Sequence, residues 1–314
     1  MAFKVMGVCA GRKDSNSEIL LKEALDACQQ LGAEVTFVNL RDYDILDCTG
    51  CTACTRGMMQ GKNVGCALSK NDDKDRLMQA MFEHDAFIFS APTYDLQVSA
   101  NFTRFMQRSL AYETAFLEAI GAITPRHRVA GLIAVGGSTR SWMSMSLESM
   151  QAAMFTCDFN VVDMLLATRV PAQAQVLSRP DHLERARKLG ENIMRSLSKA
   201  PEDRGWEGDE DFGWCPNCHS NSLSLGEMQW DGLHFKVECQ VCGCGGELKQ
   251  DGDKWKFVID PETGYSRDRT TVEGRGHHLE EIGHTQGGFY TPENMAMVRE
   301  KIVRYKQMKF NSVE

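Results

Sequence analysis

Five apolar runs alternate with helical patterns over the first 198 residues of this chain. Most of these runs are short and rich in Val, Ile, Phe or Ala, which is typical of strands buried on both faces of a parallel sheet, whereas residues 34–40 alternate between polar and apolar as a strand does. Alternation of strands and helices implies right-handed crossovers, with helices on both faces. We therefore expect an α/β fold, a flavodoxin-like, five-stranded, parallel, doubly wound sheet. The expected strands are 3–9, 34–40, 86–92, 129–135 and 160–167, and the expected helices are one ending near Gly32, then 74–83, 98–112, 141–156 and 181–197.

The composition changes after this region, which divides the chain into domains. Residues 1–198 form the predicted α/β domain, and 199–213 are acidic, contain glycine and lack periodicity, as a linker does. Residues 214–262 contain paired cysteines among short strand-like runs, with a strand pair over 247–260. Residues 263–314 form a polar tail that carries a helix over about 292–308.

Cysteines at 48, 51, 54 and 66 follow the second expected strand in a long connection, and we refer to them as the N-terminal cysteine group. Their spacing is C-x2-C-x2-C-x11-C. A C-x2-C-x2-C run with a fourth ligand further along is typical of iron–sulfur proteins, whereas zinc sites more often use two separated pairs. The spacing therefore predicts a [4Fe–4S] cluster and electron transfer, and a zinc site without electron transfer is the alternative.

The loop after the first strand, Gly11 to Ser17, offers the groups that bind a phosphate. It lacks both the G-x-G-x-x-G fingerprint and the P-loop pattern. A helix N-terminus presents free N–H groups and a positive dipole end. Arg12 or Lys13 can add charge, and Ser15, Asn16 and Ser17 can donate hydrogen bonds. An ordinary helix cap is the alternative, because Ser and Asn are common there.

Two further loops belong to the same edge of the predicted sheet. The segment SAPTYD (90–95) follows the third strand, and Gly136-Gly137-Ser138 follows the fourth. In doubly wound sheets a ligand binds outside the carboxyl ends of the strands. Pro, Tyr and small residues there indicate a site for a flat aromatic ligand.

Three segments together resemble the NADPH-dependent FMN reductase superfamily: FKVMGVCAGRKDSNSEIL, SAPTYDLQVSANFTRFMQR and LIAVGGS. With the N-terminal cysteine group, the chain most resembles the iron–sulfur flavoproteins of anaerobic microbes. The resemblance covers residues 1 to about 198. It departs from the family pattern at Ala10-Gly11-Arg12, where Gly-Ser-Pro is usual, and in the eleven residues before Cys66, a longer gap that leaves another fourth ligand open.

The resemblance implies non-covalent FMN and a set of residues that bind it. It implies that Arg12, Ser15, Asn16 and Ser17 hold the phosphate, that Pro92, Thr93, Tyr94, Asp95 and Leu96 flank the isoalloxazine, and that Gly136 and Gly137 border the flavin. It also implies that the N-terminal cysteine group binds one [4Fe–4S] cluster, near enough to exchange electrons with FMN, often across an interface in a homo-oligomer.

A second group of cysteines lies outside the resemblance. Cys215, Cys218, Cys239 and Cys242, the C-terminal cysteine group, have the spacing C-x2-C-x20-C-x2-C of a structural zinc ribbon. Rubredoxin-like iron is the alternative metal, because four thiolates suit either ion. Cys244 is a fifth thiol that could replace Cys242.

These patterns predict an oxidoreductase that moves electrons between a donor, NAD(P)H or ferredoxin, and an oxidised small-molecule or protein acceptor. No residue is assigned as a catalytic acid or base. The alternative is a redox-sensing, oxygen-sensing or protein-binding module. A net charge of −8 argues against nucleic-acid binding, and the absence of an 18-residue apolar run argues against a membrane span. No secretory signal is recognisable, so we expect a cytoplasmic location.

Overall fold

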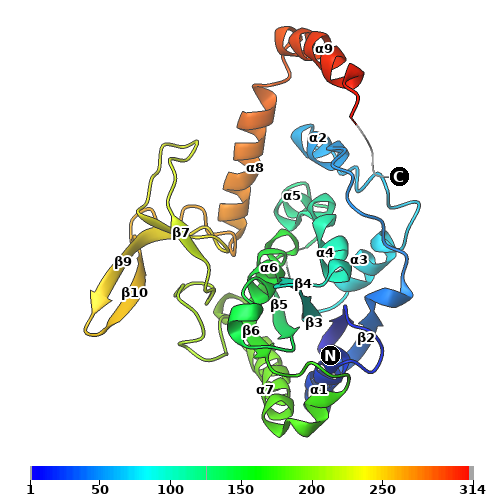
Figure 1. The fold of residues 1–314 in the computed structure, drawn as a ribbon, viewed down its shortest axis with the longest axis vertical. Coiled ribbons are helices and arrows are strands. Elements are labelled where there is room, and N and C mark those ends of the chain that lie inside the picture. The colour runs from blue at the N-terminus through cyan, green and yellow to red at the C-terminus, as the bar shows by residue number, and fades with distance from the viewer. Residues whose placement is uncertain (1, 125, 311–314) are drawn as a thin grey trace.

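The central feature of the computed structural model, which describes residues 2–124 and 126–310, is a parallel sheet with strand order β2-β1-β3-β5-β6 (Figure 1). This confirms the flavodoxin-like fold class. The order runs outward in both directions from β1 and β3, so the carboxyl ends of neighbouring strands form one edge. The strands are β1 (Lys4–Cys9), β2 (Glu34–Asn39), β3 (Ala86–Tyr94), β5 (Arg128–Val135) and β6 (Phe159–Ala167).

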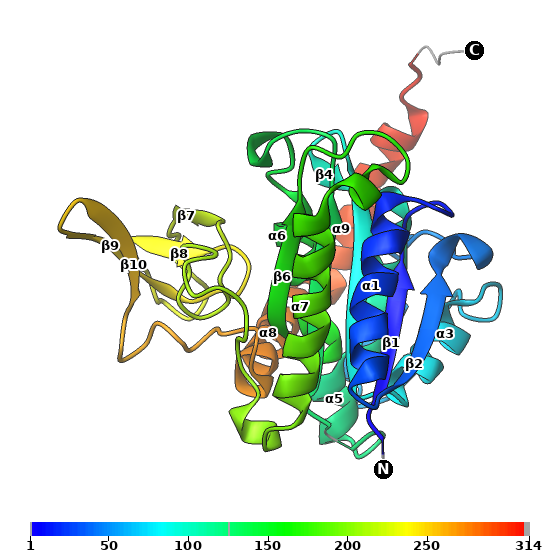
Figure 2. The same ribbon diagram turned by 90° about the horizontal axis from the view of Figure 1, so that it is seen from below.

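Helices cover both faces of this sheet because its inner strands are buried on both sides. On one face, α1 (Asn16–Gln30) and α7 (Pro180–Leu197) lie side by side (Figure 2). The other face packs against α3 (Lys74–Phe82), α4 (Ala100–Gln107) and α6 (Ser146–Ala152). A separate apolar cluster fills the layer on each face. Aromatic side chains of β3 and β6 pack together in the cluster that lies beneath α3, α4 and α6.

Contact between α1 and α7 requires a glycine. An added Cβ at Gly190 would lie 2.2 Å from the carbonyl oxygen of Ala24. The Cys28 thiol donates to the carbonyl oxygen of Gly190 across the same contact, with 3.4 Å between the two atoms. The backbones of the two helices therefore approach too closely for any side chain at position 190.

A short hairpin extends β3 beyond the predicted strand. Antiparallel β4 (Gln97–Val98) pairs with the end of β3 through a two-residue turn. Both turn residues have positive φ, 49° at Asp95 and 72° at Leu96. Such turns favour Asn-Gly, so the sequence Asp-Leu gives no local signal for the hairpin, and Leu96 adopts a strained conformation.

The predicted helix over 141–156 is wrong, because the segment is broken into three pieces. Short 3₁₀ turns, η3 (Arg140–Trp142) and η4 (Phe155–Cys157), flank α6. Tertiary contacts compete with helix formation: the Met145 N–H donates to the carbonyl oxygen of Leu96 at 3.2 Å, and Met143 packs against Gly136. Likewise, the helix expected over 98–112 divides into α4 and the 3₁₀ turn η2 (Ser109–Tyr112).

Within residues 2–124 and 126–310, three α-helices have no counterpart in the predictions from sequence. They are α2 (Ala53–Met59), inside the cysteine-rich connection, α5 (Thr114–Ala119), and α8 (Val272–Gly287). The segment that forms α8 contains several glycines and lacks a clear apolar face, so its pattern resembles a polar loop. Ionic contacts hold it instead: Arg275 pairs with Asp158 at 2.8 Å and with Glu113 at 3.5 Å.

A second, antiparallel sheet lies beside β6 and α6, with the order β10-β9-β8-β7 (Figure 2). Its strands are β7 (Leu223–Leu225), β8 (Val237–Cys239), β9 (Gly245–Asp251) and β10 (Lys254–Ile259). Phe155 of the α/β domain completes its small apolar core. Gln151 of α6 donates to the carbonyl oxygen of Cys218. The expected terminal helix is α9 (Pro292–Gln307).

Residues of the predicted linker contact both of the predicted domains that flank it. The N–H of Glu207 donates to the carbonyl oxygen of Val162 at 2.7 Å, and the indole of Trp206 stacks on the His219 ring. The predicted domain boundaries stay predictions. Among the described residues, no helix combines the length and the apolar character that crossing a bilayer requires.

Replacing Gly190 with alanine tests the packing of α1 on α7. Because the new methyl group would overlap a backbone oxygen, we expect Gly190→Ala to lower the free energy of unfolding by about 1–3 kcal/mol. Urea denaturation followed by circular dichroism measures this change. Gly205→Ala is the control, since a Cβ there meets no atom within 4 Å. Equal stability of both variants would contradict this packing.

Candidate functional site

The carboxyl ends of β1, β3 and β5 border a cavity of about 320 Å³, the sheet-edge cavity. All the residues that the resemblance assigned to FMN line it, except Asp95 and Leu96. Those residues are Arg12, Ser15, Asn16, Ser17, Pro92, Thr93, Tyr94, Gly136 and Gly137. Sequence reasoning missed the loop after β6, residues 170–173, which closes the cavity on one side and has no phosphate-binding pattern of its own.

The start of α1 provides the polar end of this cavity. Ser15 caps the helix by accepting from the N–H of Glu18. The Asn16 amide donates to the carbonyl oxygens of Val170 and Ala172 at 2.8 Å. Asn16 therefore ties the loop after β6 to α1, while the Arg12 side chain is exposed and free to meet an anion.

Two glycines keep the backbone of the cavity open. A Cβ at Gly11 would lie 2.6 Å from the Ser15 hydroxyl oxygen, and one at Gly137 would lie 2.9 Å from the Pro171 side chain. Hydroxyls, an arginine and a helix N-terminus at one end, with proline and tyrosine beyond, suit a phosphate monoester attached to a planar group. This donor set fits FMN.

All four thiols of the N-terminal cysteine group line a second cavity of about 150 Å³, the cysteine cavity. Its other walls are largely apolar, with Leu68, Leu110 and Ala111 among them. No three of these sulfurs lie within 4.8 Å of one another. In a [4Fe–4S] cluster each thiolate binds a different iron, so a wider spacing than around a single ion suits this group.

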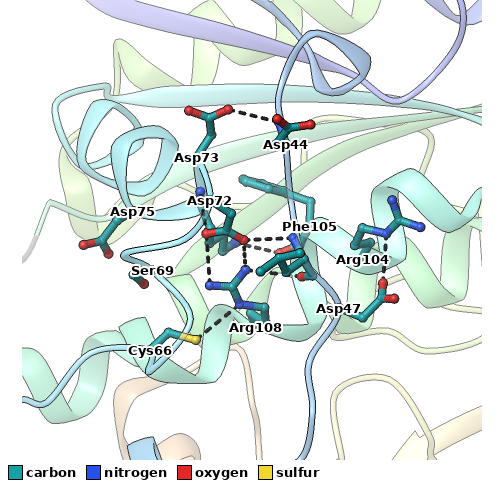
Figure 3. A network of polar contacts seen from close by, with 12 residues as sticks. Asp44, Asp47, Cys66, Ser69, Asp72, Asp73, Asp75, Arg104, Phe105 and Arg108 are labelled. Atoms are coloured by element: carbon teal, nitrogen blue, oxygen red, sulfur yellow. Dashed lines mark hydrogen bonds and ion pairs between the residues drawn. The ribbon is translucent and has the colours of Figure 1, made fainter.

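The cysteine cavity contains one cation, the guanidinium of Arg108. Its Nε donates to the Cys66 sulfur at 3.2 Å, and its two terminal nitrogens contact the carboxylate of Asp72 (Figure 3). Both side chains are almost inaccessible to solvent, 1% for Arg108 and 0% for Asp72. Burial alone would raise the pKa of Asp72, but hydrogen bonds from Arg108 and two backbone amides outweigh it and lower that pKa.

A fully buried lysine lies behind this pair. Lys74 donates from Nζ to the carbonyl oxygen of Phe105 at 2.7 Å and to the Ser109 hydroxyl at 3.1 Å. Burial lowers the pKa of Lys74 to about 7. The lysine therefore carries less than a full charge near neutral pH, which reduces its cost in this apolar layer.

An open groove of about 510 Å³ lies between the two cavities. It shares Tyr94 with the sheet-edge cavity and Gln107 with the cysteine cavity. Asp95 and Arg104 also line this groove. Leu96 is not among the residues that line the groove or either cavity, as far as the structure describes them. The two candidate sites therefore adjoin one surface region.

The C-terminal cysteine group converges on a point. The sulfurs of Cys215 and Cys242 lie 3.6 Å apart, as do those of Cys218 and Cys239. A tetrahedron of sulfurs about 2.3 Å from a metal has edges of about 3.8 Å, so this arrangement fits one zinc or iron ion. The Cys244 thiol accepts a hydrogen bond from Asn217 at 3.4 Å instead of joining the four.

Hydrogen bonds among these four thiols shift their pKa values in opposite directions. Hydrogen bonds from neighbouring thiols, that of Cys215 first, hold the pKa of Cys239 well below its ordinary value. The contact with Cys215 raises the pKa of Cys218. A divalent metal would offset the charge of four buried thiolates, which are the form that binds metal.

The histidines near this group have other contacts. The ring of His219 stacks on Trp206, and Nε2 of His277 lies 3.1 Å from the Asp231 carboxylate. Within the described ranges, no histidine belongs to a potential metal-binding group.

Comparison with known proteins agrees with this geometry. Residues 3–169 match the family described as NADPH-dependent FMN reductase. An iron–sulfur flavoprotein of Methanocaldococcus jannaschii is 31% identical over 147 residues, 46% of this chain and 68% of the relative. An iron–sulfur flavoprotein of Archaeoglobus fulgidus is 26% identical over 157 residues, 48% of this chain and 71% of the relative.

A solved structure of a flavone reductase shares the fold over 99% of this chain and 100% of its own, with a TM-score of 0.74 and 22% identity. The second sheet and the terminal helices therefore belong to an architecture that another protein also has. The family match covers more than half of this chain. The protein belongs to the NADPH-dependent FMN reductase family and, with its iron–sulfur flavoprotein relatives, is an FMN-dependent flavoprotein oxidoreductase.

Proposed function

We propose that this protein moves electrons from NAD(P)H or ferredoxin to an oxidised small-molecule or protein acceptor, through FMN in the sheet-edge cavity and a [4Fe–4S] cluster in the cysteine cavity. One observation carries the proposal: both cavities adjoin the same groove, which shares Tyr94 with the sheet-edge cavity and Gln107 with the cysteine cavity. When bound, FMN supplies two-electron chemistry and the cluster one-electron transfer.

The residues of the sheet-edge cavity bind and orient the cofactor in this proposal. Arg12 and the N-terminus of α1 hold the phosphate, while Ser17, which is buried, shapes the loop around it. Pro92 and Tyr94 flank the flavin ring. Thr93 fixes that strand end, because its hydroxyl lies 2.8 Å from the Ser146 hydroxyl.

The groove is the proposed entry for the donor and the acceptor. It carries both charges, Asp47 and Asp95 as well as Arg104, and an exposed aromatic side chain, Tyr94. A small planar molecule would approach the flavin beside Tyr94. We also propose a homo-oligomer located in the cytoplasm, with ferredoxin as a candidate redox partner and neither nucleic acid nor membrane as a partner.

The C-terminal cysteine group has a structural role in this proposal, with zinc as its metal. Its four thiols are buried and leave no open position for a substrate, as in structural zinc sites. The metal would stabilise a small sheet whose own apolar core is limited to a few residues, including Phe155 and Phe257.

Protein purified without oxygen gives the direct test. Iron, sulfide, zinc and FMN are quantified per chain, and reduction of quinone, nitroaromatic and flavone acceptors is followed with NADPH, NADH or reduced ferredoxin. We expect about four iron, four sulfide, one FMN and one zinc. Five iron atoms per chain without zinc would show that the C-terminal cysteine group binds iron and not zinc. Zinc alone, or a loaded protein inactive with every donor, would contradict the proposal.

Removing the charge of Arg12 should weaken FMN binding. The guanidinium lines the cavity, so we expect Arg12→Ala to raise the Kd of FMN about tenfold, or about 1.4 kcal/mol. Quenching of flavin fluorescence on titration of the apoprotein measures Kd. Lys13→Ala, which removes the next positive charge outside the cavity lining, is the matched control and should bind FMN as wild type does. An equal loss in both variants would indicate only a general charge effect.

Cys242 and Cys244, between which the sequence could not choose a metal ligand, should differ in their effect on metal binding. Cys242 lies within the group of four, and Cys244 does not. We therefore expect Cys242→Ser to lose the ribbon metal and to unfold the second sheet at lower temperature, whereas Cys244→Ser retains the metal. Zinc and iron analysis of the purified variants decides this. Retention of metal by Cys242→Ser would assign the fourth ligand to Cys244.

A further inference from the structure

The cysteine-rich insert is closed at its base by the buried pair Arg108–Asp72. Arg108 donates from Nη1 to the carbonyl oxygen of Leu46 at 3.2 Å, and Asp72 accepts from the Leu46 N–H at 2.8 Å. Leu46 is two residues before Cys48, and Asp72 is six residues after Cys66. The pair therefore holds both ends of the insert together, beside the fourth cysteine (Figure 3).

Neighbouring contacts strengthen the same closure. The N–H of Asp44 donates to the Asp73 carboxylate at 3.0 Å, and the N–H of Asp73 donates to the carbonyl oxygen of Asp44 at 2.8 Å. Arg104 of α4, four residues before Arg108, pairs with Asp47 at 2.8 Å. Because the entropic cost of closing a loop grows slowly with its length, the eleven residues before Cys66 add little to that cost, and this thiol lines the cysteine cavity with the other three.

Arg108 provides more than a structural tie, because it contacts the sulfur itself. Its Nε–H donates to the Cys66 sulfur, while its other nitrogens donate to Asp72 and Leu46. A planar guanidinium can make all these contacts at once, which an ammonium cannot. A protein sets the reduction potential of an iron–sulfur cluster partly through hydrogen bonds to the ligand sulfurs and through nearby charges.

We propose that Arg108 is a positioning residue that holds Cys66 as the fourth cluster ligand and raises the reduction potential of the cluster, and that Asp72 limits this effect by offsetting the arginine charge. The inference rests on the proposed function, since it requires the cluster to be bound by the N-terminal cysteine group. Reduction adds one electron, and hence one negative charge, to the cluster. A buried cation and an N–H donor at a ligand sulfur favour that reduced form.

Substitution of Arg108 and substitution of Asp72 should therefore shift the reduction potential of the cluster in opposite directions. Arg108→Gln removes the cation and the Nε donor and leaves Asp72 charged, so we expect a more negative midpoint potential. Asp72→Asn leaves Arg108 charged beside the sulfur, so we expect a more positive one. An anaerobic titration with dithionite as the electron donor, followed by electron paramagnetic resonance, measures the midpoint. Iron, sulfide and FMN per chain are measured on the same samples.

Two further variants keep the test decisive. The double variant, Arg108→Gln with Asp72→Asn, leaves no unpaired charge in the interior, so we expect it to fold even if one of the single variants does not. Its reduction potential should lie below that of wild type, because the Nε–H donor to the Cys66 sulfur is absent. Arg76→Gln is the matched control: it removes an exposed arginine that pairs with Asp73 in the same network but does not contact sulfur. Its potential should equal that of wild type.

The outcomes separate this inference from the proposed function. Wild-type protein without iron and sulfide would contradict the proposed function itself. If wild-type protein holds the cluster, and the Arg108 and Asp72 variants hold it too but have the wild-type reduction potential, only the inference about Arg108 is overturned. Shifts of the same sign in both single variants would overturn it as well, because a merely structural role moves both in one direction.

Discussion

Burial of a five-stranded parallel sheet between two layers of helices is the constraint on which the rest of this structure depends. The inner strands have apolar side chains on both faces, so each face requires its own helices, and the chain crosses from strand to helix at a single edge. That edge is where Ser15, Tyr94 and Gly136 meet. The position of the cofactor site is thus a consequence of how the core is buried.

The two cysteine groups are built on different physical principles. The C-terminal cysteine group is compact, with paired sulfurs 3.6 Å apart, and closes around a single point. The N-terminal cysteine group is spread around a cavity whose base is held by a buried ion pair. A buried pair of this kind contributes little net stability compared with apolar side chains of similar size. Its place beside Cys66 indicates a role in the site more than in the fold.

Sequence reasoning succeeded where a local pattern and the global fold agree. Four of the parallel strands are largely apolar runs, the edge strand β2 alternates between polar and apolar residues, and the long helix α7 has a clear apolar stripe. It failed where tertiary contacts override local preference. The segment 141–156 has helical spacing, yet the contacts of Met143 and Met145 break it. The segment that forms α8 lacks helical spacing, yet ionic contacts of Arg275 hold it as a helix.

The sequence by itself determined the fold class and the cysteine spacings, together with the residues that gather at the sheet edge, because each depends on order and periodicity along the chain. Only the tertiary structure decided which thiol of the pair Cys242 and Cys244 joins the compact group, and how Cys66 faces the other three cysteines across its long gap. Those outcomes depend on Asn217, Arg108 and Asp72. Such partners are distant in the sequence, and no local pattern marks them.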